Sequence, residues 1–144
     1  MIEISWDKYI QSIKELAGRV KNANFEADKI IAINRGGLLI GLIFSHQLNK
    51  PLYIIDIREN KVKWLDLNRD DKVIVVDDIS DRGDTLRLAE NTMKEMFGLS
   101  NDNILTVTLY IRPDTGFIPD IYFEEVHDWV VFPYEIDIYR RGNS

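Results

Sequence analysis

The stretch from Val73 to Leu86, VIVVDDISDRGDTL, constrains the fold more than any other part of the chain. It opens with a run of β-branched residues, which is typical of a strand buried on both faces, as in a parallel sheet. Asp77 and Asp78 follow, and the chain then passes through an Asp/Gly/Thr loop into a helical pattern. Parallel sheets bind ligands at the carboxyl ends of their strands, and N–H groups that open a helix favour phosphate. The stretch therefore predicts an anion site beside two acids.

Composition and charge narrow the class of protein. With 144 residues, 45% of them hydrophobic and 29% charged, the chain is expected to form one domain over residues 1–144. The longest apolar runs are interrupted and fall short of the roughly 20 residues that span a membrane, and no signal-peptide pattern is present. The absence of cysteine makes a cytoplasmic protein the simplest interpretation. A net charge of -6 argues against a nucleic-acid partner.

Hydrophobic periodicity predicts alternating helices and strands. Helices are expected at 5–22, 38–48 and 85–97, and strands at 29–33, 51–57, 72–77, 103–110 and 121–123. Ser5 is placed to cap the first helix and Gly98 to end the last one. The buried face of the first helix is expected to contain Trp6, Ile10, Ile13, Ala17 and Val20. The polar stretch 58–71, which includes Trp64, is interpreted as an excursion or lid.

This order of elements implies an open, mostly parallel α/β sheet flanked by helices. The loop after the first of these strands contains Arg35, Gly36 and Gly37, and the loop after the third runs from Asp77 to Thr85. Because the strands are parallel, both loops are expected at the same carboxyl edge. Two anion-binding loops with carboxylates between them suit a ligand with phosphates at two ends and hydroxyls or a metal in the middle.

These residues resemble the type I phosphoribosyltransferases, whose signature is an apolar strand, two acids and a loop of the Asp-Thr-Gly-Gly-Thr kind. The chain is most similar to the xanthine-guanine and hypoxanthine class of that family. Further matching features are the Ser5-Trp6-Asp7 segment, the Arg-Gly-Gly loop at 35–37, and the Trp-Val-x-x-Pro-aromatic-acid segment from Trp129 to Glu135. The resemblance implies the family's parallel sheet, with a small hood formed by the terminal segments.

The resemblance also implies an activity. It is the transfer of ribose 5-phosphate from phosphoribosyl pyrophosphate to a purine nitrogen, with Mg²⁺ as the cofactor and pyrophosphate as the leaving group. Asp77 and Asp78 would hold the ribose hydroxyls, and Asp78 would also belong to the metal shell. The family further implies a homo-oligomer, either a dimer or a tetramer.

Other roles follow from the same resemblance, position by position. The 5-phosphate loop would comprise Asp81, Arg82, Gly83, Asp84 and Thr85, and Asp81 would be the catalytic acid/base near the purine imidazole. The pyrophosphate would meet Arg35, Gly36 and Gly37. The purine would contact Arg112, Trp129 and Val130.

The chain departs from the family pattern at several positions. Arg82 stands where the family has Thr, Asp84 where Gly or Lys is common, and Arg112 where a Lys is usual; the 58–71 stretch is short for a catalytic lid. A second interpretation is therefore a non-catalytic sensor of phosphoribosyl pyrophosphate or a nucleotide on the same fold. A third is a phosphoacceptor receiver domain, in which paired acids normally end the first strand. Taken singly, Asp77 and Asp78 also suit a strand end, Trp129 a core and Arg112 a surface turn.

Overall fold

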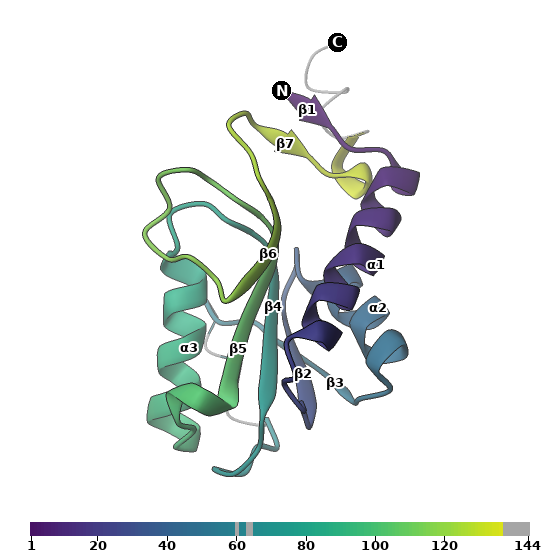
Figure 1. Cartoon of the computed structure of the whole chain (residues 1–144). Coiled ribbons are helices and arrows are strands. Elements are labelled where there is room, and N and C mark those ends of the chain that lie inside the picture. The colour runs from purple at the N-terminus through teal and green to yellow at the C-terminus, as the bar shows by residue number, and fades with distance from the viewer. Residues whose placement is uncertain (60, 63–64, 137–144) are drawn as a thin grey trace.

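A five-stranded parallel sheet in the order β3-β2-β4-β5-β6 forms the centre of the computed structural model, which describes residues 1–59, 61–62 and 65–136 (Figure 1). Its strands are β2 (Lys29–Ile33), β3 (Leu52–Ile55), β4 (Val73–Ser80), β5 (Ile104–Ile111) and β6 (Ile121–Glu125). Neighbouring strands all pair in parallel. The predicted α/β class and the parallel sheet are confirmed.

The central strand β4 is buried on both faces, as its run of β-branched residues predicted. Successive side chains of a strand point to opposite faces. Ile74 and Val76 pack into the core beneath α1 (Trp6–Asn22) and α2 (Leu38–Leu48). Val73 and Val75 pack into a second core that includes α3 (Asp84–Phe97). Figure 1 shows the corresponding layers, with α1 and α2 on one side of the sheet and α3 on the other.

The helix ends follow the local sequence signals. Ser5 caps α1 by accepting a hydrogen bond from the Lys8 N–H at 3.1 Å, and Gly98 ends α3 with a φ of 72°. The expectation that Trp6 lies on the buried face is wrong, since 51% of this residue is exposed. Tyr9 takes the buried place instead, because the rings of Phe132 and Tyr134 pack edge-on against it.

The hood predicted from the family resemblance is a separate two-stranded sheet. It joins β1 (Ile2–Glu3) and β7 (Val130–Val131) in parallel, near the two ends of the chain. Figure 1 shows it beyond the carboxyl end of the main sheet, over the first turn of α1. Neither strand was expected from periodicity, because two residues are too few to show an alternating pattern.

The largest error in the predicted boundaries concerns β4. The strand continues three residues beyond Asp77, to Ser80, so both acids lie within it. Pairing with β5 accounts for the extension, since Ile79 and Ser80 align with Tyr110 and Ile111. The strand β3 is shorter than expected, β6 is two residues longer, and α3 begins one residue earlier.

The described residues of the expected excursion are anchored to the body of the protein. Ile57 and Val62 are buried, and an antiparallel bridge joins Asp56 to Lys61. Lys29 holds the later part through Nζ contacts with the Asp66 carbonyl at 2.7 Å and Asp71 at 2.9 Å. Trp64 lies outside the described residues. Within the described part of the chain, none of the helices has the length and apolar character needed to cross a membrane.

Candidate active site

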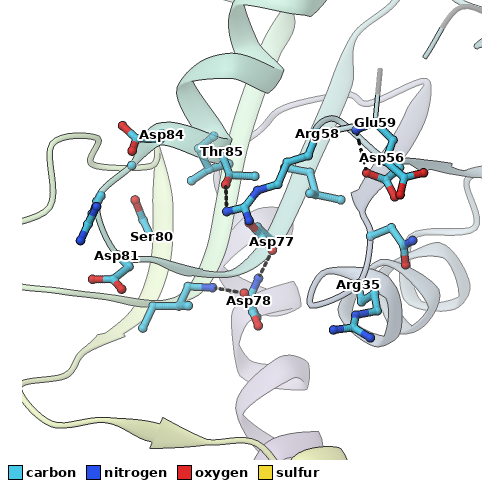
Figure 2. A pocket seen from close by; sticks show the side chains of 16 residues that line it. Arg35, Asp56, Arg58, Glu59, Asp77, Asp78, Ser80, Asp81, Asp84 and Thr85 are labelled. Carbon is cyan, nitrogen blue, oxygen red and sulfur yellow. Dashed lines mark hydrogen bonds between the residues drawn. The ribbon is translucent and has the colours of Figure 1, made fainter. Parts of the chain in front are cut away.

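A cleft of about 880 Å³ opens at the carboxyl edge of the sheet (Figure 2). Its walls come from the β2–α2 loop, the turn after β3, and the segment from the end of β4 into α3. The lining residues are Ile33, Asn34, Arg35, Asp56, Arg58, Glu59 and residues 77–86. The structure thus brings the two sequence-predicted loops to one edge, as the parallel topology required.

The adjacent acids of β4 serve different sides of this cleft. Strand alternation places Asp77 on the α3 side and Asp78 on the α1 and hood side. The Asp77 Oδ1 atom accepts a hydrogen bond from the Asp78 N–H at 2.9 Å, and Asp78 Oδ1 accepts one from the Ile79 N–H at 2.7 Å. Figure 2 shows Asp77 beneath Arg58, while Asp78 points away from Arg58. One ligand can therefore contact the two carboxylates from different directions.

Burial makes both carboxylates difficult to ionise. The pKa of Asp77 is raised well above its ordinary value, mainly by burial and next by the charge of Asp78, while Arg58 acts in the opposite direction. Burial likewise raises the pKa of Asp78, although the N–H of Ile79 donates to it and favours the ionised form. A cation bound here would relieve both effects, since opposite charge stabilises carboxylate.

The glycines of the β2–α2 loop are explained by close approach. A Cβ atom on Gly36 would lie 2.2 Å from Asp78 Oδ2, and one on Gly37 would lie 2.2 Å from the Val76 carbonyl oxygen. The Asn34–Arg35 peptide in this loop is cis. The Gly37 N–H donates to the Ile33 carbonyl at 2.9 Å. Because this N–H is already used, we expect Arg35 and Gly36 to contribute more to anion binding than Gly37.

The β4–α3 loop is braced by the 115–117 turn. Ser80 is buried, and its hydroxyl donates to the Phe117 carbonyl at 2.7 Å. The Gly116 N–H donates to the Arg82 carbonyl at 3.0 Å. Gly83 has a φ of 91°, and a Cβ atom there would lie 2.5 Å from Phe117 Cβ, so this position requires glycine. These contacts hold the loop in the conformation that opens α3.

The two unusual members of this loop are both exposed. Asp84 is paired with Arg87 at 3.4 Å, one turn along α3, and 76% of its side chain is exposed. Arg82 lines the cleft and is likewise exposed. At the start of α3, the Thr85 hydroxyl accepts a hydrogen bond from Arg58 at 3.4 Å. The Asp84 carboxylate is therefore drawn along the helix toward Arg87.

The residues expected to meet a purine lie between this loop and the hood. The Arg112 Nε atom lies 3.7 Å from Asp81 Oδ1, and the Arg112 guanidinium donates to the Asp128 carbonyl. Val130 is buried within β7, and 51% of Trp129 is exposed. Arg112, Trp129 and Val130 do not line the cleft itself. The structure thus joins Arg112 to Asp81 and places the other two beside the cleft.

Two residues of this region were missed by sequence reasoning. Arg58 follows β3 and lines the cleft, and its position after a strand end was a signal that could have found it. The Tyr134 hydroxyl donates to Asp78 Oδ2 at 3.4 Å, and its ring stacks on Phe132 at 5.6 Å. No local pattern links Tyr134 to Asp78, because the contact joins residues 56 positions apart.

Comparison with known proteins agrees with this geometry. The profile of the family described as phosphoribosyl transferase domain matches residues 5–140. The xanthine-guanine phosphoribosyltransferase of Chromohalobacter salexigens is 26% identical over 147 residues, covering 94% of this chain and 84% of that protein. A purine phosphoribosyltransferase structure from Pyrococcus horikoshii has a TM-score of 0.79 at 28% identity and covers 92% of both chains.

A Neisseria gonorrhoeae protein solved with bound ppGpp shares the fold, with a TM-score of 0.74 at 24% identity over 96% of this chain and 94% of that one. The family profile spans both anion loops, the paired acids and the hood strand β7. The third interpretation, a receiver domain, does not fit this match or the position of the acids in β4. This chain belongs to the phosphoribosyltransferase domain family.

Proposed function

We propose that this protein transfers ribose 5-phosphate from phosphoribosyl pyrophosphate to a 6-oxopurine base, namely guanine, xanthine or hypoxanthine, and releases pyrophosphate in purine salvage. The observation that supports this most is the cleft that both predicted anion loops line together with Asp77 and Asp78. The similarity to purine phosphoribosyltransferases at 26–28% identity points to the same substrate class.

Three parts of the cleft suit three parts of the ligand. The N–H groups from Gly83 to Thr85 open α3 and suit the 5-phosphate. Asp77 and Asp78 would accept hydrogen bonds from the ribose hydroxyls, and Arg35, which lines the cleft, would bind the pyrophosphate together with the Gly36 amide. As the bond to pyrophosphate breaks, negative charge grows on the leaving group. Donors fixed beside it then stabilise the transition state more than the ground state.

Magnesium fits this donor set as a partner of the substrate. The described residues form no cluster of three or more side chains able to hold a metal by themselves. Mg²⁺ keeps several waters and commonly binds one or two carboxylates together with substrate phosphates. Asp78, whose pKa is raised by burial, offers hard oxygen ligands of this kind, with Asp77 next to it. Bound with the substrate, the ion would neutralise charge on the pyrophosphate.

The base would lie between the β4–α3 loop and the hood. Asp81 is proposed as the general acid/base at the imidazole nitrogen, and Arg112 as the donor to the exocyclic oxygen. The Trp129 and Val131 carbonyls accept from Ile2 and Ile4. Because carbonyls alternate along a strand, the polar groups of Val130 face the opposite edge, where a purine would meet them. Trp129 would stack on the ring.

The second candidate is a non-catalytic sensor of phosphoribosyl pyrophosphate or a nucleotide. Arg82 and Asp84 in the phosphate loop and the short 58–71 stretch favour it. The neighbour with bound ppGpp is a further reason to test guanine nucleotides as ligands of this chain.

A substrate panel separates the two candidates. The protein is incubated with phosphoribosyl pyrophosphate, Mg²⁺ and labelled guanine, xanthine, hypoxanthine or adenine, and nucleotide formation is measured. A nucleotide from at least one 6-oxopurine, and little from adenine, is expected. If no nucleotide formed from any base, the proposed transfer would be wrong. Tight binding of phosphoribosyl pyrophosphate or a nucleotide in calorimetry, without turnover, would then favour the sensor.

Two further expectations need other measurements. Light scattering would test the expected dimer or tetramer, and cell fractionation would test the expected cytoplasmic location.

A further inference from the structure

The cleft as a whole is lined by more acidic than basic side chains. The cleft lining contains six carboxylates, from Asp56, Glu59, Asp77, Asp78, Asp81 and Asp84, against three arginines, Arg35, Arg58 and Arg82. A phosphate placed on the amides from Gly83 to Thr85 would have two loop acids, Asp81 and Asp84, as neighbours, with Arg82 as the one cation of the loop. Such a ligand needs a cation aimed at those amides.

Arg58 meets this geometric requirement. It comes from the turn that follows β3, where Asp56 and Lys61 form an antiparallel bridge and the Lys61 N–H donates to the Asp56 carbonyl at 3.0 Å. The buried side chains of Ile57 and Val62 anchor this turn on both sides of Arg58. Figure 2 shows the Arg58 side chain extending from the turn across the cleft, with its guanidinium between Thr85 and Asp77.

The contact between Arg58 and Thr85 is long and uses few of the donors that Arg58 offers to a phosphate. The guanidinium donates to the Thr85 hydroxyl at 3.4 Å, which is longer than a usual N–H···O hydrogen bond of about 2.7–3.2 Å. Arginine has five N–H donors in a planar fork that matches phosphate, and this contact uses one of them. Asp84 pairs with Arg87 instead, so its carboxylate does not neutralise Arg58.

We infer that Arg58 binds the 5-phosphate of the ligand together with Thr85, and adds positive charge beside a loop in which Arg82 stands against Asp81 and Asp84. This inference rests on the proposed function, because it assumes a ligand with a phosphate at the Thr85 end of the cleft. It assigns a binding role to the beginning of the 58–71 stretch. The first residue of that stretch then acts as a fixed part of the phosphate site.

Calorimetry on the full chain tests this assignment with three ligands: ribose 5-phosphate, magnesium pyrophosphate and phosphoribosyl pyrophosphate with Mg²⁺. Arg58→Ala is expected to weaken ribose 5-phosphate and phosphoribosyl pyrophosphate by about tenfold to a hundredfold, the usual range for a hydrogen bond to a charged group. Magnesium pyrophosphate is expected to bind as before. Arg58→Lys should fall between Ala and wild type, since it keeps the charge and loses the fork.

Lys61→Ala is the matched control. Lys61 is a cation of the same turn, but it pairs with Glu59 at 2.8 Å, 71% of its side chain is exposed, and it does not line the cleft. Its removal is expected to leave all three affinities unchanged. Because Arg58 is exposed, its variants are expected to fold, and circular dichroism with thermal melts verifies this.

Several outcomes would overturn the inference. These are unchanged ribose 5-phosphate affinity in Arg58→Ala, a larger loss for magnesium pyrophosphate than for ribose 5-phosphate, or an equal loss in Lys61→Ala. Wild-type protein that binds no ribose 5-phosphate would also overturn it. Failure of the proposed transfer shows separately, as wild-type protein that binds these ligands and makes no nucleotide. A selective loss in Arg58→Ala would still support the inference in that case.

Discussion

Asp77 and Asp78 are neighbours in the chain, yet they belong to different surroundings. Alternation along β4 turns Asp77 toward Arg58 and Asp78 toward the side of the hood. Tyr134 and Gly36 both lie close to the Asp78 carboxylate. A pair of identical residues thus acquires two chemical environments from a strand period of two. Asp78 is less buried than Asp77, which supports the proposal that Asp78 is the metal ligand.

Asp78→Asn is expected to weaken magnesium-dependent binding of phosphoribosyl pyrophosphate by at least about tenfold, because the amide removes a charged oxygen ligand. Calorimetry with and without Mg²⁺ measures this. Glu95→Gln, which removes a charge from an exposed position of α3, is the control and should bind as wild type does. Equal affinity of Asp78→Asn and wild type in Mg²⁺ would contradict the assignment.

Asp81→Asn is expected to lower kcat by about 10²–10⁴-fold, the usual contribution of a general acid/base. The affinity for phosphoribosyl pyrophosphate should change little, because the loop amides remain. Loss of the Asp81–Arg112 pair should change the free energy of unfolding little, because 61% of the Asp81 side chain is exposed to solvent. Steady-state kinetics checks the split, with Asp102→Asn as an exposed control. Full activity in Asp81→Asn would show the acid/base assignment to be wrong.

Tyr134→Phe tests the contact between Asp78 and the segment that follows β7. The variant removes the donor to Asp78 Oδ2 and keeps the ring that stacks on Phe132. The KM for phosphoribosyl pyrophosphate is expected to rise about two- to tenfold, in line with one hydrogen bond, while the melting temperature stays nearly constant. Tyr122→Phe, on β6, serves as the control. A fall in melting temperature with unchanged KM would mean that Tyr134 is only structural.

At the scale of elements, contacts with the segment after β5 hold the β4–α3 connection, the predicted phosphate loop, in place. The 115–117 turn contacts it through Ser80, Gly116 and Phe117, and these contacts join it to the segment after β5. Arg112 opens that same segment and reaches Asp81. The phosphate loop and the expected base-binding arginine are therefore held in one arrangement.

Gly83→Ala is expected to lower the free energy of unfolding by about 1–3 kcal/mol, since alanine disfavours positive φ and its Cβ would collide with Phe117. Urea denaturation measures the change. Gly18→Ala is a matched control in the middle of α1, with no atom within 4 Å of the added Cβ. It should stabilise the protein by about 0.5–1 kcal/mol. If Gly83→Ala proved as stable as wild type, the loop would not depend on glycine there.

Sequence patterns predicted the long elements well and the short ones poorly. The four-residue apolar run, the Ser5 cap and the Gly98 stop are local signals, and the structure confirms each of them. The extension of β4 to Ser80 depends on pairing with β5, and the strands β1 and β7 depend on each other. Pairing of this kind depends on a distant segment, so the local hydrophobic pattern of either segment does not predict it.

At the scale of the whole molecule, the buried acids tie stability to pH. The pKa of Asp77 is raised in the folded state, mainly by burial, so the folded protein binds this proton more tightly than the unfolded chain does. As pH rises above about 4, the unfolded chain releases the proton first. Stability therefore falls with rising pH through this window, up to the raised pKa.

Asp77→Asn should remove this effect, because the amide stays neutral and its oxygen can still accept the Asp78 N–H. In EDTA, the variant is expected to match wild type in free energy of unfolding below about pH 4. It should become the more stable protein as pH rises. Denaturant titrations at a series of pH values measure the difference. A constant difference across all pH values would mean that Asp77 does not titrate with a raised pKa.

The sequence by itself determined the class of sheet and the edge of the sheet at which both predicted anion loops lie. It could do so because burial patterns, glycines and strand–loop order are local properties, and a parallel topology brings strand ends together. Only the tertiary structure decided that Arg58 reaches Thr85 and that Tyr134 reaches Asp78. These two contacts join segments far apart in the chain, so no local pattern could predict them.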